Sequence, residues 1–212
     1  MTSPKHGEPD TPQLLLKAAR KVFARKGFPA ATVKEIADEA GVNISLISYH
    51  FNGKEGIYRA CLREFGEQRL SAAKRILTPP ESEGDMRAKL KLLGHDFFQT
   101  HVDCPEVCAM MHQDSATNLS LVRDLYDGFF MKFFETLIEF LASAKKKKFV
   151  RPDLEPLHAA GFYFGAIVHV GRSSLILKEF YNLSLDNQKY REKLVDDFVD
   201  YFLNGIRGGR NA

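Results

Sequence analysis

Apolar residues recur along this chain at the three- and four-residue spacing that places them on one face of an α-helix. No stretch alternates apolar and polar residues, between turn-forming pairs, for long enough to indicate a strand. Hydrophobic residues make up 44% of the 212 residues and charged residues 27%, which is enough apolar material for a core. The pattern therefore predicts an all-α fold.

The cysteines and the first residues bear on the compartment. Cys61, Cys104 and Cys108 are an odd number, and residues 1–12 are polar, without the apolar core of a secretory signal. We therefore expect a reducing, cytoplasmic environment. Residues 159–170 are the longest nearly apolar stretch, well short of the ~20 residues that cross a bilayer. We expect a buried helix there and no membrane partner.

Positive charge is concentrated near the N-terminus. Residues 1–54 hold eight Lys and Arg against five Asp and Glu, whereas residues 55–212 hold 22 of each. A small basic module joined to a neutral body is typical of nucleic-acid-binding proteins.

Helix signals divide this basic quarter. Thr11 is expected to cap a first helix that has Pro12 at its first position and ends at Gly27. Residues 32–35 (Thr-Val-Lys-Glu) form a capping box for a second helix, which ends at Gly41. Residues 54–77 are predicted to form a long fourth helix.

Between the second and fourth helices, Asn43 is expected to cap a short third helix over residues 44–50. Val42, Ile47 and Phe51 would anchor it on the first two helices. Its outward face would then carry small hydroxyls, aliphatic side chains and a tyrosine: Ile44, Ser45, Leu46, Ser48 and Tyr49.

Two short helices joined by a glycine-containing turn, after a longer helix, describe a helix-turn-helix. The third helix would enter the major groove of DNA, which is ~12 Å wide. Lys54 supports this interpretation. A cation in the first turn of a helix opposes the helix dipole, and a bound phosphate would remove that conflict.

Residues 14–62 combine these features in a way that resembles the DNA-binding domain of the TetR family of transcriptional regulators. The motifs that carry the resemblance are Thr32-Val33-Lys34-Glu35-Ile36-Ala37, Ala40-Gly41-Val42, Tyr49-His50-Phe51 and Lys54-Glu55. The resemblance implies a homodimer on a palindromic, double-stranded DNA operator, usually a repressor that a small molecule releases.

The predicted DNA-binding residues combine this resemblance with the outward face of the third helix. They are Thr32, Lys34, Asn43, Ile44, Ser45, Leu46, Ser48, Tyr49, His50 and Lys54. Residues 43–48 depart from the family pattern, because Asn43 replaces a serine cap and the next five residues lack the usual lysine, glycine and threonine. We expect the cap to survive and the base preference to differ.

The predicted domains are a mobile arm (1–10), the helix-turn-helix domain (11–54), a helical effector-binding and dimerisation domain (55–207) and a tail (208–212). Further helices are expected over residues 85–102, 105–115, 118–147, 154–182 and 186–206.

Dimerisation is expected to involve the last two of these helices. Gly161 and Gly165 would let two helices approach closely, and the last helix carries an apolar stripe of Leu194, Phe198, Tyr201 and Phe202. The resemblance implies a four-helix bundle between two copies. The alternative is that both surfaces belong to the internal core.

A ligand pocket is predicted where bulky apolar residues accompany scattered polar ones. Its candidate residues are Phe97, His101, Met110, Met111, His112, Tyr126, Phe130, Phe133, Phe162, His169 and Arg172. The hypothesis is a largely hydrophobic effector with a negative group for Arg172. Ordinary core packing is the alternative for most of the aromatic residues.

No metal and no cofactor are predicted. Cys104 and His112 on one helix would lie ~12 Å apart, whereas the ligands of one zinc ion lie within ~4 Å. A metal- or redox-responsive regulator using Cys104 and Cys108 remains an alternative, as does a DNA-binding architectural protein without an effector. No dinucleotide loop, phosphate loop, zinc-protease motif or nucleophile elbow is present, so an enzyme is not expected.

Overall fold

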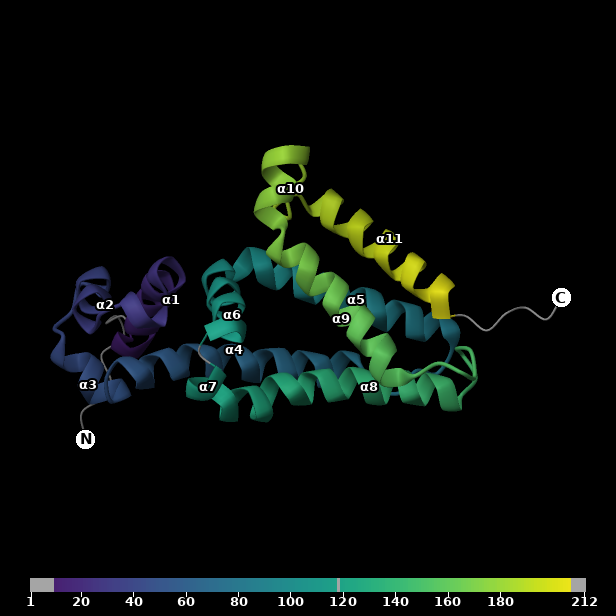
Figure 1. Cartoon of the computed structure of the whole chain (residues 1–212), viewed down its shortest axis with the longest axis horizontal. Helices are drawn as coiled ribbons and strands as arrows, with labels where there is room; N and C mark the ends of the chain where they lie inside the picture. Colours follow the sequence, from purple (N-terminus) through teal and green to yellow (C-terminus); the bar gives the residue numbers. More distant parts are fainter. Residues whose placement is uncertain (1–9, 118, 207–212) are drawn as a thin grey trace, which may run out of the picture. The chain divides into compact units, whose positions relative to one another are not determined.

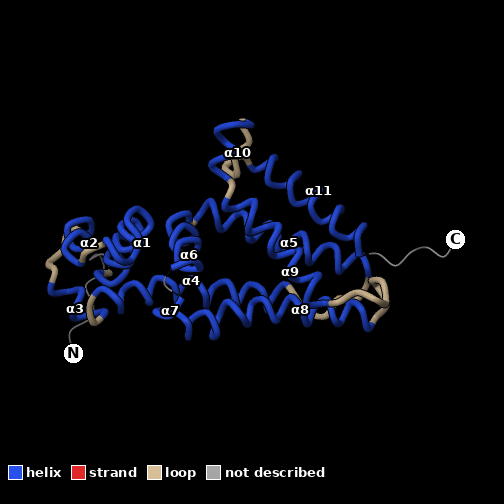
Figure 2. The backbone as a smooth tube through the Cα atoms, viewed as in Figure 1, coloured by secondary structure: helices blue, strands red, loops and turns tan. Residues whose placement is uncertain are grey.

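The computed structural model describes residues 10–117 and 119–206, which form helices joined by short loops, with no strand among them (Figures 1 and 2). The elements are α1 (Thr11–Ala30), α2 (Val33–Ala40), α3 (Ser45–Phe51), α4 (Lys54–Ile76), α5 (Glu83–Asp103), α6 (Pro105–Thr117), α7 (Leu119–Leu125), the π-helix η1 (Tyr126–Phe130), α8 (Met131–Lys146), α9 (Pro156–Arg172), α10 (Ser174–Tyr181) and α11 (Gln188–Ile206). The predicted all-α fold is confirmed.

Two of the expected long helices are wrong in detail. The helix expected over 118–147 is divided into α7, η1 and α8. The helix expected over 154–182 breaks at Ser173, where α9 and α10 meet with a bend of 56°. The apolar spacing continues through both breaks, which is why the pattern alone did not reveal them. At the start of α1, Asp10 rather than Thr11 occupies the cap position.

The chain divides into two compact units. One contains Met1–Gly66 with Glu106–Leu125, and the other contains Glu67–Pro105 with Tyr126–Ala212. Both units include part of α4. These units do not follow the functional division expected after residue 54, and that division stays a prediction. Apart from Asp10, the expected arm and tail lie outside the described residues.

The first unit is built around the apolar faces of α1, α2, α3 and α4. Its fully buried side chains include Phe23, Ile36, Ile47 and Tyr58. The Phe23 and Tyr58 rings meet edge to face, with centroids 4.8 Å apart. Aromatic pairs of this geometry add to the stability gained by burial, so this contact helps to hold α1 against α4.

The second unit has a core shared by α5, α8, α9 and α11. Tyr163 of α9 lies in it, buried, and its hydroxyl donates to the carbonyl oxygen of Leu90 at 2.6 Å. The rings of Phe198 and Phe202 of α11 pack on Tyr163 at 4.9 and 5.2 Å between centroids. The second unit therefore has a core of its own, centred on α9.

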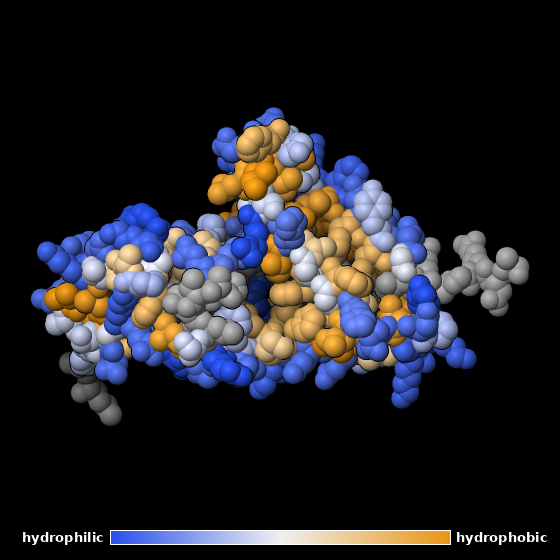
Figure 3. All heavy atoms as spheres, viewed as in Figure 1, coloured by the Kyte–Doolittle hydropathy of each residue, from blue (hydrophilic) through white to orange (hydrophobic). Residues whose placement is uncertain are grey.

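One helix of the second unit is apolar but not buried. α10 has no buried residue, and apolar colour gathers over it in the space-filling view (Figure 3). In the described residues no single helix is long and apolar enough to cross a membrane. The bent pair α9 and α10 passes the same test of length and composition.

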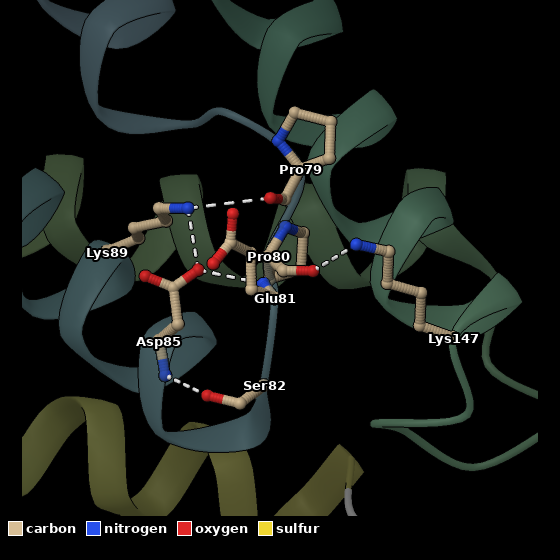
Figure 4. A network of polar contacts seen from close by, with 7 residues as sticks. All are labelled: Pro79, Pro80, Glu81, Ser82, Asp85, Lys89 and Lys147. Atoms are coloured by element: carbon tan, nitrogen blue, oxygen red, sulfur yellow. Dashed lines mark hydrogen bonds and ion pairs between the residues drawn. The ribbon is translucent and has the colours of Figure 1, made fainter.

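Polar contacts close the connection between α4 and α5 (Figure 4). Lys147 donates to the carbonyl oxygen of Pro80 at 2.7 Å, and Lys89 pairs with Asp85 at 2.7 Å. Ser82 caps α5 by accepting from the amide of Asp85 at 3.1 Å. Lys89 holds the pKa of the Asp85 carboxyl below its ordinary value. This part of the basic run at 145–148 therefore binds backbone oxygen within the chain.

Candidate nucleic-acid interface

The approach to α2 is set by a break in α1 and by a capping box. Gly27 has φ 74° and ψ 164°, outside the helical region, and the chain turns there toward Thr32. The Thr32 hydroxyl accepts from the Glu35 amide at 3.2 Å, while a Glu35 carboxylate oxygen accepts from the Thr32 amide at 3.1 Å. The predicted capping box is confirmed, and it orders the first turn of α2.

The turn between α2 and α3 also follows the sequence prediction. Gly41 adopts the left-handed conformation that ends α2 (φ 68°). The Asn43 side chain accepts from the amide of Ser45 at 2.9 Å, so the predicted cap is present although the helix begins one residue late, at Ser45. At the other end, Asn52 has φ 59° and its amide donates to the carbonyl oxygen of Ser48 at 3.1 Å.

One side chain of α3 is fully buried, two are half-buried and the other four are exposed. Ile47 is fully buried, and Val42 and Phe51 are half-buried. Leu46 and Lys54 are half-buried too, and the remaining predicted DNA-binding residues are exposed, Tyr49 by 81%. An exposed helix with hydroxyl, imidazole and phenol groups can donate to phosphates and to base edges.

Lys54 makes contacts that the sequence did not reveal. Its ammonium donates to the carbonyl oxygen of Pro29 at 3.1 Å and lies 4.6 Å from the centroid of the Phe28 ring. The first residue of α4 is thereby tied to the end of α1. The carbonyl oxygen and the ring therefore stabilise part of the positive charge for which a DNA phosphate is the expected partner.

Two lysines of α1 pair with two of the three acidic residues of α2. Lys26 pairs with Glu35, and Lys21 pairs with Glu39 at 3.0 Å. These lysines hold the pKa of each carboxyl below its ordinary value, and the Thr32 hydrogen bonds act in the same direction on Glu35. Because two of its three carboxylates are paired in this way, α2 repels an approaching phosphate less.

Three further contacts hold the first unit together, and no local pattern predicted them. Arg20 pairs with Glu64 at 2.7 Å, between α1 and α4. Arg59 of α4 donates to the carbonyl oxygen of Leu121 at 2.6 Å and pairs with Asp124. Each contact joins residues more than 40 positions apart, so sequence spacing carries no signal for it.

The predicted pocket residues fall into separate groups. One group lies around Phe164, whose ring centroid is 6.1 Å from that of Phe97 and 5.6 Å from that of Phe133. The His101 ring joins this group through Phe97, with centroids 4.7 Å apart. Burial lowers the pKa of His101. Tyr126 and Phe130 contact each other on η1, and Met110, Met111 and His112 lie on α6 in the other unit.

Three predicted pocket residues of α9 point away from this cluster. Phe162 is 75% exposed, and His169 and Arg172 are exposed as well. Helical spacing explains the correction, because residues 162, 165, 166, 169 and 172 share one face while residues 160, 163, 167 and 171 share the buried one. Phe164, which is half-buried and was not among the predicted pocket residues, contacts Phe97 and Phe133, and the pocket itself stays a prediction.

The predicted dimer residues are also divided. Gly161 and Gly165 lie on the exposed face of α9, and Tyr201 is exposed on α11. Phe198 and Phe202 pack on Tyr163. These two residues therefore belong to the internal core, as the alternative interpretation expected. Leu194 is half-buried against the same core.

The cysteines give little support to sensing chemistry in the described residues. No group of three or more His, Cys, Asp or Glu side chains lies close enough there to hold a metal ion. Burial raises the pKa of the Cys61 thiol to about 12, which suppresses the reactive thiolate. The proposed role of Cys104 and Cys108 stays a prediction.

A short exposed helix, presented after a glycine turn and anchored on two others, defines a helix-turn-helix DNA-binding regulator. Residues 15–61 match a family model described as bacterial regulatory proteins, tetR family. By this match, residues 15–61 resemble the DNA-binding domain of TetR-family transcriptional regulators.

The similarity to known proteins extends beyond this segment. The probable HTH-type transcriptional regulator YttP of Bacillus subtilis (strain 168) is 25% identical over 132 residues, 61% of this chain and 63% of its own length. The fatty acid degradation regulator FadR from Bacillus halodurans superposes with a TM-score of 0.74 at 20% identity, over 96% of this chain and 100% of that one. FadR from Bacillus subtilis in complex with stearoyl-CoA superposes with a TM-score of 0.74 at 19% identity, over 92% of this chain and 99% of that one.

Proposed function

We propose that this chain is a homodimeric repressor that binds a palindromic operator through α3 and is released by a hydrophobic effector. The observation that carries the proposal is the contrast along α3 between buried Ile47 and exposed Ser45, Ser48, Tyr49 and His50. One such helix reads only a few base pairs. Adequate affinity therefore needs a second copy on a half-site ~34–36 Å away.

The outward face of α9 supports the dimer. A Cβ atom added at Gly161 or Gly165 would meet nothing within 4 Å, so this face is open to another helix. Phe162 is a large, exposed apolar side chain on the same face of α9 as those glycines. Tyr201 is a large, exposed side chain on α11. Such residues are typical of the centre of an interface.

The effector would bind among the aromatic side chains of the second unit, around Phe97, Phe133 and Phe164. Long-chain acyl-CoA thioesters are the first class to test, because they combine an apolar chain with negative charge. The Bacillus subtilis neighbour in complex with stearoyl-CoA favours the same choice.

Release would proceed through α4, since this helix runs through both units, with Lys54–Gly66 in the first and residues from Glu67 in the second. Effector binding would displace α4 and change the separation of the two α3 helices. A coupling free energy of ~1–3 kcal/mol would weaken operator binding about 5–150-fold. The operator must weaken effector binding by the same factor.

DNA recognition is tested by selecting binding sites from random duplexes with the full chain. We expect enrichment of a two-fold symmetric site whose half-sites are about one helical turn apart. Selection of no sequence, with binding that depends on salt alone, would indicate an architectural DNA-binding protein instead. Because operators lie in the bacterial cytoplasm, the proposal includes that localisation.

Effector linkage is tested by titrating stearoyl-CoA with and without the selected operator, using free CoA and stearate as controls. Reciprocal weakening supports the mechanism, and identical affinities in both titrations would refute it. Loss of DNA binding on chelation or oxidation, with no response to acyl-CoA, would favour the metal- or redox-responsive alternative.

A further inference from the structure

The negative group of the proposed effector needs a cation near the aromatic cluster around Phe164. Arg172 does not supply it, because this residue is exposed on the outward face of α9. Arg69 of α4 is a different kind of residue, since it lies half-buried in the second unit with 22% of its side chain exposed. A partly buried cation is costly unless an anion accompanies it, so its surroundings indicate what it holds.

Arg69 is held by two polar side chains of α5. Its Nη1 donates to Oδ2 of Asp96 at 2.7 Å and also to the hydroxyl oxygen of Thr100. Thr100 is only 7% exposed, and its own hydroxyl donates to the carbonyl oxygen of Asp96 at 2.7 Å. The Thr100 oxygen is thereby oriented to accept from Arg69. We call Arg69, Asp96 and Thr100 the Arg69 cluster.

The Arg69 cluster adjoins the aromatic side chains on α5. Phe97 and His101 directly follow Asp96 and Thr100, and the helix rises only about 1.5 Å per residue. The ring of Phe97 contacts that of His101 and that of Phe164. Neighbouring positions on a helix point about 100° apart, so the polar pair and the aromatic pair line adjacent sides of α5. A ligand whose apolar part lies along Phe97 would therefore carry its end group toward Arg69.

We infer that Arg69 binds the anionic group of the effector, and that Asp96 occupies this position on the guanidinium until the effector arrives. The inference rests on the effector of the proposed function and names the residue that recognises its charge. The group recognised would be a carboxylate or a phosphate, the two anions that an arginine binds best. The Asp96 side chain is 27% exposed, so water can solvate it after the exchange.

The geometry of the pair favours such an exchange. Asp96 and Thr100 are bound by the same nitrogen of Arg69, and Asp96 uses a single oxygen, Oδ2, for this contact. Arginine binds an anion more strongly when two of its nitrogens face two oxygens. A ligand carboxylate or phosphate that meets the guanidinium in this way would compete effectively with Asp96.

The position of Arg69 would connect this exchange to DNA release. α4 begins at Lys54 in the first unit, and Arg69 is the third residue of the part of α4 that belongs to the second unit. Its contact with Asp96 and Thr100 joins α4 to α5. An effector that takes Arg69 from these partners would change what holds α4, the helix through which release is proposed to proceed.

Other half-buried cations of the second unit serve a different helix pair. Arg87 pairs with Asp200, and Lys91 pairs with Asp196 at 2.6 Å, both between α5 and α11. The Arg87 side chain is 29% exposed, close to the value for Arg69. The pair of Arg87 and Asp200 is therefore a matched control of similar chemistry and burial on the same helix.

The experiment measures the affinity of stearoyl-CoA and of stearate by isothermal titration calorimetry, each below its micelle concentration. Arg69→Gln should weaken binding of the anion at least about tenfold, because a charged hydrogen bond is lost. Asp96→Asn should strengthen binding about threefold or more, because the competing charge is removed while the side-chain shape is kept. An ion pair with a purely structural role would not give opposite signs for its two partners.

Three controls accompany these variants. The neutral methyl ester of stearate should bind the two variants within about twofold of the unmodified chain. Arg87→Gln and Asp200→Asn should leave the affinity of both anionic compounds unchanged. Arg69→Lys keeps the charge without the fork, so its affinity should lie between those of the unmodified chain and Arg69→Gln. Helical circular dichroism, retained in every variant, ensures that lost binding is not a failure to fold.

The outcomes separate this inference from the proposed function. Opposite shifts with stearate would identify a carboxylate as the group bound, and opposite shifts with stearoyl-CoA alone would identify a phosphate. Acyl binding that both variants weaken, or that neither variant changes, would overturn the role of Arg69 and leave the acyl effector intact. Binding of neither anionic compound by the unmodified chain would reject the acyl effector itself and this inference with it.

Discussion

The ammonium of Lys54 donates to the carbonyl oxygen of Pro29 at 3.1 Å and lies over the ring of Phe28. This contact joins the first residue of α4 to the last turn of α1, just before the capping box of α2. An ammonium has three protons, so one can bind Pro29 while others remain for a phosphate. Lys54 is therefore suited both to hold the helix-turn-helix in place and to contact DNA.

Replacing Lys54 by methionine separates these two roles, because the apolar stem remains and the charge is lost. We expect the free energy of unfolding to fall by about 1 kcal/mol from the lost hydrogen bond. The slope of log affinity against log salt should fall by about 0.9 if one phosphate contact is lost. Urea unfolding and fluorescence anisotropy at several salt concentrations measure the two quantities. Lys17→Met, at an exposed position of α1, is the control.

Gly171 is expected to tolerate no side chain. A Cβ atom there would overlap the imidazole of His101, with ring carbons only 2.8 Å away. Gly171→Ala should therefore destabilise the chain by about 1–3 kcal/mol, as overpacked cores do. The double variant with His101→Ala should recover part of this loss. Gly128→Ala on η1 has open space around it and should be neutral or slightly stabilising. Equal effects of the two glycine substitutions would contradict the packing argument.

The Glu35 carboxylate should make stability depend on pH. Lys26 and the Thr32 hydrogen bonds hold its pKa below the ordinary value of 4.5 in the folded chain, so unfolding in acid takes up a proton. Its contribution is then complete above the pKa of the unfolded state and is lost as the pH falls through the lower folded-state pKa. Urea unfolding between pH 7 and pH 3 should show a smaller decline for Glu35→Gln than for the unmodified chain. Parallel pH curves would show that the Lys26 and Thr32 contacts contribute nothing.

The α3 residues should differ from Lys34 in what they do to DNA binding. Ser48→Ala or Leu46→Ala should change the base preference, because hydroxyl and apolar side chains contact base edges. Lys34→Ala should weaken binding to all duplexes alike and reduce the salt dependence. Binding to a panel of single-base operator variants measures the difference. A uniform loss for all three substitutions would mean that α3 contacts only the backbone.

Local signals in the sequence predicted the helix-turn-helix well. The Thr32–Glu35 capping box, the left-handed Gly41 and the Asn43 cap each depend on residues within four positions, and all three are present. The contact between Lys54 and Pro29 spans 25 positions, and no spacing rule could reveal it. It follows from packing that only the folded chain provides.

The second half was less predictable because apolar spacing does not say which apolar face is buried. Residues 154–182 read as one helix, yet the chain bends at Ser173 and α10 departs from α9. Phe162 was assigned to the pocket although the buried face of α9 carries Tyr163. Neighbouring aromatic residues on one helix differ by about 100° in direction. An error of a single position can therefore move a side chain from the buried face of α9 to the exposed one.

The caps at both ends of α3 bear on how the protein would search for its site. Asn43 and Asn52 close the two ends and Ile47 fixes the middle, so the helix is complete before any duplex arrives. A protomer that slides along random sequence would present the same finished surface at each step, with no entropy spent on ordering a segment at every encounter. Recognition would then be limited by one-dimensional diffusion and not by folding on the DNA.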